Sequence, residues 1–373
     1  MTRRVVHYID SDTFGGSEEA ALHLIASLDR SRWTPVLLHH RDPGIARMVR
    51  QAARLGVRAC AVPRWGRSGL VGALPIWREL QTERPAIFHA HLSWPFACRH
   101  GIRAAWLARV PGIVGTGQLF VAPEAGRRPP PLVLGAYRRI IAVSEEVRRR
   151  YATDLRVPAR KLVVVRNAIR IPARVPARNP AYRAALLDGR PDYLVLTPAR
   201  MHPQKGHTYL LQAAAQVPNA TFVLAGDGPL RAALEAEARD LGVAGRCVFL
   251  GERLDVADLL AAADLFVLPS LFEGLPVSVL EAMAAERPVI ATAIGGTDEA
   301  VAHEGTGLLV PPKDPAALAA AIRRLQDDPA AARRLAVAGR ARVEREFSSD
   351  ATASQVMAIY DQVLAEAGVS SGG

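Results

Sequence analysis

The sequence predicts an α/β protein built from two Rossmann-like, doubly wound parallel sheets that face a cleft. Short apolar runs alternate with helical patterns along the whole chain, one proline-rich stretch interrupts the alternation, and 373 residues exceed one ordinary domain. Repeated strand–helix units favour parallel sheets with helices on both faces, because their crossovers are right-handed. Such sheets bind ligands at the carboxyl ends of their strands.

The candidate strands are short apolar runs that end at polar or turn-forming residues. In the first half they lie at 4–9, 34–39, 57–62, 86–90, 112–116, 139–143 and 162–166. In the second half they lie at 193–198, 221–225, 246–250, 264–268, 288–292 and 307–310. Helical patterns occupy 17–29, 44–55, 96–109, 144–153, 205–216, 229–241, 255–262, 277–285, 314–326, 329–347 and 353–367. Strands and helices therefore alternate in both halves.

The domain boundary is marked by prolines. Residues 171–180 read Ile-Pro-Ala-Arg-Val-Pro-Ala-Arg-Asn-Pro and show no helical period, which is typical of a linker. We expect an N-terminal domain at 1–170, a second domain at 171–350, and a C-terminal helix and tail at 351–373. We favour packing of this tail on the first domain over its use in a dimer.

The composition is that of a globular protein with a real core, because half of the residues are hydrophobic and 22% are charged. The three cysteines, Cys60, Cys98 and Cys247, have no paired spacing, so neither a disulfide framework nor a zinc site is expected. No signal peptide is recognised before the first apolar run, and no apolar stretch approaches the length of a membrane span, about 18 residues. We expect a cytoplasmic protein.

Positive charge is concentrated in the first half. Residues 1–170 hold 28 Lys and Arg against 12 Asp and Glu, a net charge of +16, whereas residues 171–373 have a net charge of −5. A basic first domain fits an anionic acceptor or peripheral contact with an anionic membrane, which would place the protein at the inner membrane face. The alternative, which stays open, is an ordinary solvated basic surface. Nucleic acid is not expected, because no recognised binding motif appears.

Two carboxylates in the second half are candidate ligand contacts. Glu273 follows a predicted strand, and Glu281 lies eight residues later in the next predicted helix. This strand–loop–helix spacing allows both to face the cleft. A carboxylate can accept two hydroxyl hydrogen bonds, which suits the diol of a ribose or sugar.

Arg200 and Lys205 lie between a predicted strand and the following helix. Positive charge near a helix N-terminus opposes the helix dipole, so its presence there indicates a bound anion. The guanidinium fork and the ammonium can together neutralise a diphosphate, assisted by backbone N–H groups at the helix N-terminus. We expect a diphosphate site here.

Glycines mark two further strand-to-helix turns. Gly226 begins a Gly-Asp-Gly-Pro turn that could let a nucleotide approach the backbone, although the full Gly-x-Gly-x-x-Gly pattern is absent. Gly15 and Gly16 follow the first strand, where a phosphate or sugar could come close, and Ser17 is expected to cap the next helix. Asp10-Ser-Asp12 has the form of a metal–nucleotide motif, but it lies far from the predicted phosphate site in sequence, and we expect no metal.

Two histidines end a predicted strand of the first half. His89 and His91 alternate, so both imidazoles should lie on one face of the sheet. A histidine at the carboxyl end of a strand can orient a sugar hydroxyl or move a proton. His91, nearer the end, is the stronger candidate, and His89 is expected to serve the core.

Taken together, these residues resemble the retaining family 4 glycosyltransferases of the GT-B fold. Order and spacing match over roughly residues 193–325. The matching segments are Thr-Pro-Ala-Arg200, Lys205-Gly206, Ala-Gly-Asp-Gly-Pro229, Phe-Leu-Gly251, Ala-Asp-Leu-Phe-Val-Leu-Pro-Ser270, Phe-Glu273-Gly, Leu-Glu281-Ala-Met, Pro-Val-Ile-Ala-Thr, Ile-Gly-Gly296 to Glu299 and Gly-Leu-Leu-Val-Pro-Pro312. The first half matches more loosely, at Gly15-Gly16, His89-Ala-His91, Ala-Val-Ser144-Glu145 and Val-Val-Arg-Asn167.

The resemblance implies a role for each matching residue. Arg200 and Lys205 would hold the donor diphosphate, Glu281 the ribose, and Glu273 the donor sugar. In the first domain, Gly15 and Gly16 would admit the donor phosphate and sugar, and His91 would contact the sugar near the reacting carbon. The catalytic set is then His91, Glu273, Arg200 and Lys205, and Gly226, Gly274 and Leu275 complete the donor site.

The chain departs from the family pattern at two places. After Glu273-Gly274 the family often has an aromatic residue and a glycine, whereas this chain has Leu275 and Pro276, and proline offers no N–H to a sugar hydroxyl. The interdomain Asn-Gly-x-Asp pattern is Asn-Ala-Ile-Arg at 167–170. These departures bear on the donor sugar and on acceptor contacts, which the sequence leaves open.

The resemblance implies transfer of a sugar from a nucleotide-sugar, here expected to be a UDP-sugar, to a hydroxyl acceptor with retention of configuration. We expect no cofactor and no metal, a sugar or lipid-linked acceptor, and a role in polysaccharide, lipopolysaccharide or other glycoconjugate biosynthesis. Three alternatives stay open on a similar fold: a sugar phosphorylase, a nucleotide-sugar epimerase, and a non-enzymatic nucleotide-sugar sensor.

Overall fold

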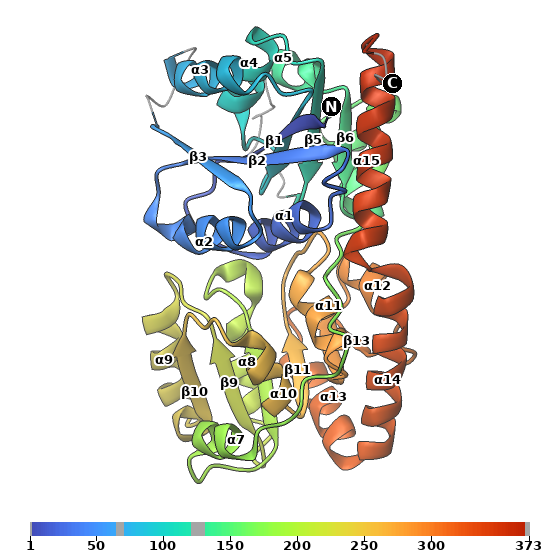
Figure 1. Cartoon of the computed structure of the whole chain (residues 1–373). Coiled ribbons are helices and arrows are strands. Elements are labelled where there is room, and N and C mark those ends of the chain that lie inside the picture. The colour runs from blue at the N-terminus through green and yellow to red at the C-terminus, as the bar shows by residue number, and fades with distance from the viewer. Residues whose placement is uncertain (1, 65–70, 121–130, 370–373) are drawn as a thin grey trace. The chain divides into compact units, whose positions relative to one another are not determined.

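The computed structural model describes residues 2–64, 71–120 and 131–369 (Figure 1). The chain forms two compact units: unit 1 comprises Met1–Arg170 and Ser349–Gly373, and unit 2 comprises Ile171–Ser348. Each unit contains one parallel sheet covered by helices, as the sequence predicts. No helix in the described part of the chain has the length and apolar character needed to cross a membrane.

The sheet of unit 1 has seven parallel strands in the order β3-β2-β1-β4-β5-β6-β7. Their bounds are β1 (Arg3–Ile9), β2 (Trp33–His40), β3 (Arg58–Val62), β4 (Ile87–Leu92), β5 (Gly112–Gly117), β6 (Arg139–Ala142) and β7 (Leu162–Val164). The chain moves outward from β1 to β3 and then returns to place β4 on the other side of β1. The strand order therefore reverses between β1 and β4, which is where open α/β sheets bind ligands.

Helices cover both faces of this sheet. They are α1 (Gly16–Ala26), α2 (Ala46–Arg54), α3 (Leu74–Glu83), α4 (Arg99–Leu107), α5 (Pro131–Ala136), α6 (Glu145–Thr153) and α15 (Ser349–Glu366), with 3-10 turns η1 (Pro43–Ile45), η2 (Val71–Ala73) and η3 (Ala159–Lys161). In Figure 1, α3, α4 and α5 lie on one face of the sheet, and α1 and α2 lie on the other.

The last helix, α15, is part of the core of unit 1. Tyr360 is fully buried, and its ring lies 5.1 Å from that of Trp33. The same hydrophobic cluster includes Val5 of β1, Ile87 of β4 and Val114 of β5. A segment more than 340 residues from β1 in sequence thus covers the centre of the N-terminal sheet.

The sheet of unit 2 has six parallel strands in the order β10-β9-β8-β11-β12-β13. Their bounds are β8 (Leu194–Pro198), β9 (Thr221–Ala225), β10 (Cys247–Gly251), β11 (Leu265–Leu268), β12 (Val289–Thr292) and β13 (Leu308–Val310). Most of these strands are buried along their length, which explains their nearly continuous apolar sequences. Here the order reverses between β8 and β11.

The helices of unit 2 alternate with its strands. They are α7 (Pro180–Leu187), α8 (His207–Ala214), α9 (Arg231–Asp240), α10 (Val256–Ala262), α11 (Val277–Ala284), α12 (Thr297–Ala300), α13 (Pro315–Asp327) and α14 (Pro329–Glu346), with 3-10 turns η4 (Pro203–Lys205) and η5 (Ala244–Arg246). Phe222 of β9 is the largest fully buried side chain in the main core cluster, which also includes Leu211 of α8 and Ile322 of α13.

The fold class and all thirteen predicted strands are confirmed, with ends shifted by up to two residues. The sequence patterns missed α3, α5, α7 and α12. Each of the first three has a proline as its first or second residue, which was not recognised as a helix start, and α12 is a single turn. The predicted linker is irregular only to Asn179, whose side chain caps α7.

Candidate active site

In unit 2, the site begins in the turn after β8, next to the reversal of strand order. Arg200 is exposed in this turn, and the 3-10 turn η4 that follows ends at Lys205. Gly206 has φ +65°, and a Cβ there would lie 2.1 Å from the carbonyl oxygen of Pro269, just after β11. Glycine therefore allows the segment around Lys205 to lie directly against the end of β11.

Lys205 forms a largely buried ion pair with Glu273 from the loop after β11. The Lys205 Nζ lies 2.5 Å from Glu273 Oε1, and the two side chains are 17% and 8% exposed. Ser270 Oγ donates a hydrogen bond to the same oxygen over 2.7 Å, and Gln204 Nε2 donates to Glu273 Oε2 over 3.3 Å. Donors hold both carboxylate oxygens, so the orientation of Glu273 is fixed.

We call Gln204, Lys205, Ser270 and Glu273 the switch-point cluster. An ammonium has three N–H donors and a carboxylate about four lone-pair sites, so both charged groups keep capacity for a ligand. The negative charge of Glu273 balances the positive charge of Lys205 in the protein without ligand. The cluster therefore offers a donor for phosphate and an acceptor for hydroxyls side by side, already ordered.

Arg200 and Glu281 flank the switch-point cluster without belonging to its ion pair. Arg200 lies in the turn after β8, and Glu281 is half-buried in the second turn of α11. The structure thus joins Lys205 and Glu273 directly. It places Arg200 in the turn after β8 and Glu281 in the helix after β11, the two strands between which the strand order of unit 2 reverses.

The loop after Glu273 is held by the neighbouring turn after β12. Gly296 has φ +86°, and a Cβ there would lie 1.5 Å from the carbonyl oxygen of Gly274, so no larger residue fits. Gly274 is buried and Leu275 is 3% exposed, and Pro276 then caps α11. The side chain of Leu275 therefore contributes packing that shapes the loop.

Gly226 begins the turn after β9. It has φ +154°, and a Cβ there would lie 2.1 Å from the carbonyl oxygen of Ala199, beside Arg200. The next residue, Asp227, accepts a backbone hydrogen bond from Met201 over 2.8 Å. Gly226 thus brings the turn after β9 against the turn that carries Arg200, which agrees with the predicted tight strand-to-helix turn.

In unit 1, the corresponding turn follows β1 and begins α1. Gly15 is the N-cap of α1, and its N–H donates to Glu18 Oε2 over 2.9 Å. The prediction that Ser17 caps this helix is wrong: Ser17 is the second helical residue, and Glu18 makes the capping contact. Gly16 is exposed, and a Cβ there would meet nothing within 4 Å, so the protein itself does not require a glycine at this position.

The acidic residues near this turn have structural partners. Glu18 is buried and accepts from Ser11 Oγ over 2.5 Å, and burial raises the pKa of its carboxyl group. The Asp10 carboxylate accepts from the backbone N–H of Cys98 over 2.5 Å, and Asp12 is exposed. Asp10 therefore ties the end of β1 to the start of α4, a structural role for half of the Asp-x-Asp pattern.

His89 and His91 lie on the same face of β4, as alternation predicts. Their rings stack with centroids 4.5 Å apart, and His7 of β1 lies beside both. His89 contacts Tyr360 OH over 2.5 Å and Thr116 Oγ1 over 2.7 Å, so both of its ring nitrogens are used within the core. His89 therefore serves the core, as expected.

His91 differs from His89 in keeping one ring nitrogen available. Its Nε2 lies 3.0 Å from Nδ1 of His7, whereas its buried Nδ1 has no hydrogen-bond partner. Burial lowers the pKa of His91 to about 3, so the imidazole is neutral near pH 7. A neutral ring can orient a hydroxyl by a hydrogen bond, but it is a poor proton donor, which favours the first of its two predicted roles.

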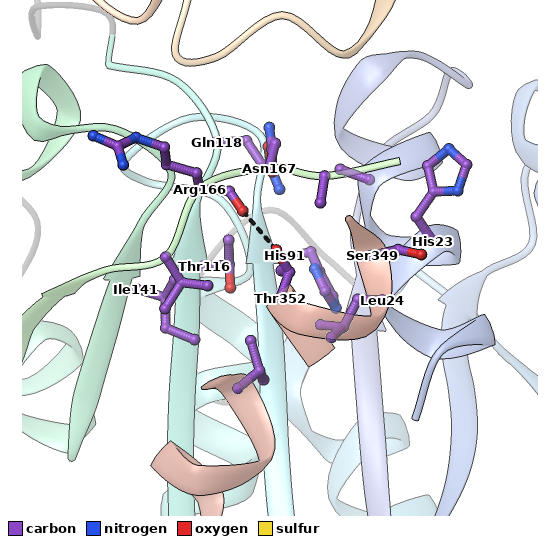
Figure 2. A pocket seen from close by; sticks show the side chains of 14 residues that line it. His23, Leu24, His91, Thr116, Gln118, Ile141, Arg166, Asn167, Ser349 and Thr352 are labelled. Carbon is purple, nitrogen blue, oxygen red and sulfur yellow. Dashed lines mark hydrogen bonds between the residues drawn. The ribbon is translucent and has the colours of Figure 1, made fainter. Parts of the chain in front are cut away.

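His91 Nδ1 belongs to a small pocket at the carboxyl ends of the unit 1 strands (Figure 2). The pocket, of about 30 Å³, has room for one or two water molecules or a hydroxyl group. Its lining comprises Ala20, His23, Leu24, His91, Thr116, Gln118, Ile141, Val165, Arg166, Asn167, Ala168, Ser349, Thr352 and Val356. Asn167 donates to Gln118 in its wall over 2.7 Å. The lining thus combines polar and apolar side chains and includes neither Asp nor Glu.

Several of these residues were not predicted as site residues. Ser270 and Gln118 each lie within two residues of the end of a buried strand, a position that could have identified them. Gln204 lies beside Lys205 and could be placed only by the contact between two loops. His23 lies inside a predicted helix, and no sequence signal brings it to the pocket.

Family profiles match most of the chain. The family described as Glycosyl transferases group 1 matches residues 192–328, and Glycosyltransferase Family 4 matches residues 14–171. The two matches correspond to the two predicted domains; the first includes β4, and the second includes both strands at the reversal in unit 2, β8 and β11.

Three curated relatives show different extents of similarity. The 2-deoxystreptamine glucosyltransferase of Streptomyces kanamyceticus is 30% identical over 357 residues, 86% of this chain and 92% of its own length. The UDP-Gal:alpha-D-GlcNAc-diphosphoundecaprenol alpha-1,3-galactosyltransferase of Escherichia coli is 30% identical over 275 residues, 68% and 70% of the two chains. The lipopolysaccharide core biosynthesis glycosyltransferase LpsD of Rhizobium meliloti is 34% identical over 184 residues, 49% of this chain and 54% of its own.

Solved structures share the two-domain fold. HepE of Anabaena, in complex with UDP and glucose, has a TM-score of 0.82 at 22% identity and covers 96% of this chain and 100% of its own. Sucrose-phosphate synthase from Thermosynechococcus elongatus has a TM-score of 0.77 at 22% identity, with 98% and 100% covered. These similarities confirm the predicted GT-B architecture.

Proposed function

Because the chain belongs to the group 1 family of glycosyltransferases, we propose that it transfers a sugar from a UDP-sugar to a hydroxyl acceptor, with retention of configuration and without a metal ion. The observation that carries the donor assignment is the switch-point cluster. A lysine and a glutamate, fixed by Gln204 and Ser270, lie where the strand order of unit 2 reverses. A nucleotide-sugar presents phosphates and hydroxyls, and this cluster has a partner for each.

The donor site uses the residues around this cluster. Arg200 and Lys205 bind the diphosphate, the former as a planar fork and the latter as a compact charge. Glu281 binds the ribose hydroxyls, and Glu273 accepts hydrogen bonds from the donor sugar. In support, Glu273 is the acidic partner of Lys205, so the sugar and the phosphate that it carries would meet adjacent side chains.

The first domain supplies neutral contacts. Gly16 leaves open space at the N-terminus of α1, where backbone N–H groups favour a phosphate oxygen. His91 offers its unpartnered Nδ1 to a sugar or acceptor hydroxyl. Because this ring is neutral, its contribution is to hold a hydroxyl in position, and the displaced proton goes elsewhere.

The reaction is a substitution at the anomeric carbon. The acceptor oxygen forms a bond to this carbon from the face that UDP leaves, while the bond between the carbon and the β-phosphate oxygen breaks and its electron pair departs with UDP. A phosphate oxygen takes the acceptor proton. Arg200, Lys205 and the N-terminus of α8 stabilise the charge that grows on the leaving diphosphate, the task that a metal ion performs in other enzymes.

The acceptor is a sugar or lipid-linked hydroxyl compound of glycoconjugate biosynthesis. Two of the three relatives described above support this class: the Rhizobium protein is named for lipopolysaccharide core biosynthesis, and the Escherichia coli protein for a diphosphoundecaprenol-linked sugar. A lipid diphosphate would also suit the excess positive charge of residues 1–170.

Thermal stabilisation by UDP, GDP and ADP, each measured with EDTA present, tests the donor site. We expect UDP to stabilise the wild type, and stabilisation to be lost in Glu281→Ala and kept in Glu252→Ala, which removes an exposed glutamate from the same unit. Stabilisation that disappears with EDTA would contradict the metal-free proposal.

Turnover then distinguishes the enzyme classes. With a radiolabelled UDP-sugar and a panel of acceptors, we expect acceptor-dependent release of UDP and a product of unchanged anomeric configuration. Phosphate-dependent sugar release would indicate a phosphorylase, and an epimerised donor without acceptor would indicate an epimerase. Binding without any turnover on any acceptor would indicate a sensor.

A further inference from the structure

Two buried histidines of the unit 1 sheet form a hydrogen-bonded pair beside the pocket. His7 of β1 and His91 of β4 are both buried, and His7 Nδ1 lies 3.0 Å from His91 Nε2. The ring planes differ by 23°, and the centroid separation of 5.3 Å is about the distance between these nitrogens plus the depth of the two rings. The rings therefore meet edge to edge, so that a proton on one nitrogen points at the lone pair of the other.

Each ring of this pair carries a single proton near pH 7. Burial, with smaller effects of His91 and Arg30, lowers the pKa of His7 well below its ordinary value, and burial lowers the pKa of His91 to about 3. A neutral imidazole has one N–H and one bare nitrogen, so the pair has two arrangements. In the first, His7 donates from Nδ1, and His91 carries its own proton on Nδ1. In the second, His91 donates from Nε2, and His7 carries its own proton on Nε2.

The two outer nitrogens of the pair have different surroundings. His91 lines the pocket, where a hydroxyl group can pair with either form of its Nδ1. His7 does not line the pocket, and its buried Nε2 has no hydrogen-bond partner among the described residues. His89 cannot serve it, because Tyr360 and Thr116 engage both of its nitrogens. A buried N–H without an acceptor is rarer in proteins than an acceptor without a donor, so the first arrangement, which leaves His7 Nε2 bare, is favoured.

A shared metal ion suits this group less well than a hydrogen bond. The ring nitrogens of His7, His89 and His91 lie close enough to hold one. However, hydroxyl groups already engage both nitrogens of His89, and its ring stacks on that of His91 with the planes only 20° apart. A metal ion lies near the plane of each imidazole that binds it, and two stacked rings cannot direct their lone pairs at one point. The pair of His7 and His91 therefore acts through its protons.

We propose that His7 is a positioning residue that sets the tautomer of His91: it donates from Nδ1 to Nε2 of His91, so that His91 presents Nδ1–H to the pocket. The ring then offers a hydrogen-bond donor, which binds an oxygen lone pair of a substrate hydroxyl and cannot take up its proton. The same bond keeps the His91 ring from turning over, which would replace the nitrogen at the pocket by a carbon. The role in sugar transfer rests on the proposed function, whereas the tautomer is a property of the free protein.

Nuclear magnetic resonance of the full chain, labelled with ¹⁵N-histidine, tests the tautomer directly. Near neutral pH, long-range correlations between ring protons and ring nitrogens distinguish a protonated nitrogen from a bare one. Spectra of His91→Gln and His7→Phe assign the two rings among the ten histidines. We expect Nδ1 to carry the proton in both rings, with an excess of about tenfold or more over the other arrangement. A proton on Nε2 of His91 would overturn the proposal, because His91 would then present an acceptor to the pocket.

Two substitutions of His7 test whether it sets this tautomer. His7→Phe keeps an aromatic ring but removes both nitrogens, so His91 should show both tautomers once its Nε2 has lost the N–H that selected one. His7→Asn should retain the wild-type tautomer, since an amide N–H can take the place of Nδ1–H. An unchanged tautomer in His7→Phe would overturn the proposal, because the pocket alone would then determine it.

Turnover shows whether the tautomer matters for the reaction. His7→Phe should lower kcat severalfold, toward the loss in His91→Gln, and His7→Asn should recover most of it. In the His91→Gln background His7→Phe should have no further effect, whereas independent effects would multiply. UDP affinity should stay unchanged in each variant. Losses that multiply would contradict the positioning role and indicate that His7 acts through the packing of the sheet.

His40 of the neighbouring strand β2 provides the matched control. It is also buried, with Nε2 2.8 Å from Tyr8 OH and Nδ1 3.3 Å from the carbonyl oxygen of Val62. His40→Phe should lower thermal stability but leave the His91 tautomer and kcat unchanged, and an equal change in this variant would contradict the proposal. If the protein turns over no sugar, the proposed function fails while the spectra still decide the tautomer. If an active enzyme has Nε2 of His91 protonated, only this inference fails.

Discussion

The two units share a topology but differ in the chemistry at the point where strand order reverses. In unit 2 the strand ends at this point carry a charged pair, Lys205 and Glu273, held by further donors. In unit 1 they carry three buried histidines whose rings adjoin one another. His7 and His91 each keep a ring nitrogen without a partner, and of the three only His91 lines the pocket. Topology thus sets the position of each site, and side chains decide what each can bind.

Burial explains the difference in charge. The three histidines are buried, His89 against Tyr360 of α15, and desolvation lowers the pKa of His7, His89 and His91, which keeps them neutral. Lys205 and Glu273 lie nearer the surface and neutralise each other. Unit 2 can therefore hold an anion, whereas unit 1 suits hydroxyl groups.

The largest expected effect comes from removing the cation. Lys205→Ala should lower kcat by about 10²–10³-fold, because a donor to the leaving diphosphate is lost in the transition state. Lys205→Arg should recover part of the rate. Steady-state kinetics with a UDP-sugar would measure this, and a kcat within threefold of the wild type would contradict the role.

Neutralising the other partner should separate binding from turnover. Glu273→Gln retains the shape but removes the charge that offsets Lys205, so UDP should bind severalfold more tightly while kcat falls at least tenfold. Isothermal titration with UDP measures the expected gain in affinity, and steady-state kinetics on the same preparation measures the expected fall in kcat. Weaker UDP binding would indicate that Glu273 serves mainly to position Lys205.

Acid should destabilise unit 1 more than unit 2. The folded-state pKa of the three histidines is lowered, so below pH 6.5 the unfolded chain takes up protons that the folded unit does not. The contribution of these neutral histidines to the free energy of unfolding is fully present above about pH 6.5. It is lost as the pH falls toward their pKa in the folded state, which is about 3 for His91. Each histidine should reduce the free energy of unfolding by about 1 kcal/mol between pH 7.5 and 5.5.

Tryptophan fluorescence isolates this effect, because all five tryptophans lie at positions 33–106, in unit 1. In urea titrations, the fluorescence midpoint should shift down with acid more than the circular dichroism midpoint, which reports on both units. Equal shifts by the two probes would refute the comparison.

Two histidines of the same strand should respond differently to substitution. His91→Gln should leave UDP affinity and stability nearly unchanged and lower kcat by about tenfold, the worth of one hydrogen bond. His89→Gln should instead reduce stability by about 1–3 kcal/mol, since it leaves Tyr360 or Thr116 without its buried partner. Thermal unfolding beside kinetics on both variants distinguishes the roles.

The smallest effect on stability is expected at Gly16. Gly16→Ala fits without contact and should change the free energy of unfolding by at most about 1 kcal/mol, yet it should weaken turnover if a ligand uses the open space. Gly226→Ala would clash with a backbone oxygen and should cost about 2 kcal/mol or more. Chemical denaturation compares the two, and unchanged turnover in Gly16→Ala would remove Gly16 from the donor site.

Periodicity predicted the strands because buried parallel strands need continuous apolar runs, as in Leu265–Leu268. Charged residues just after such strands, Lys205 and Glu273, could be identified for the same reason, since strand ends meet at one edge of the sheet. Gln204 could not, because its hydrogen bond to Glu273 joins residues 69 positions apart. The cap of α1 was missed because glycine, with no side chain, here relies on Glu18.

The sequence by itself determined the two parallel sheets, their boundary near Ile171 and the segments that carry the site, because local periodicity and turn chemistry act within short stretches of chain. Only the tertiary structure decided the pairing of Lys205 with Glu273, the placement of Tyr360 against His89, and that His91 lines the pocket with a ring nitrogen that has no partner. Those outcomes depend on contacts between loops and helices far apart in sequence, where small differences in approach determine which polar groups are paired and which are buried alone.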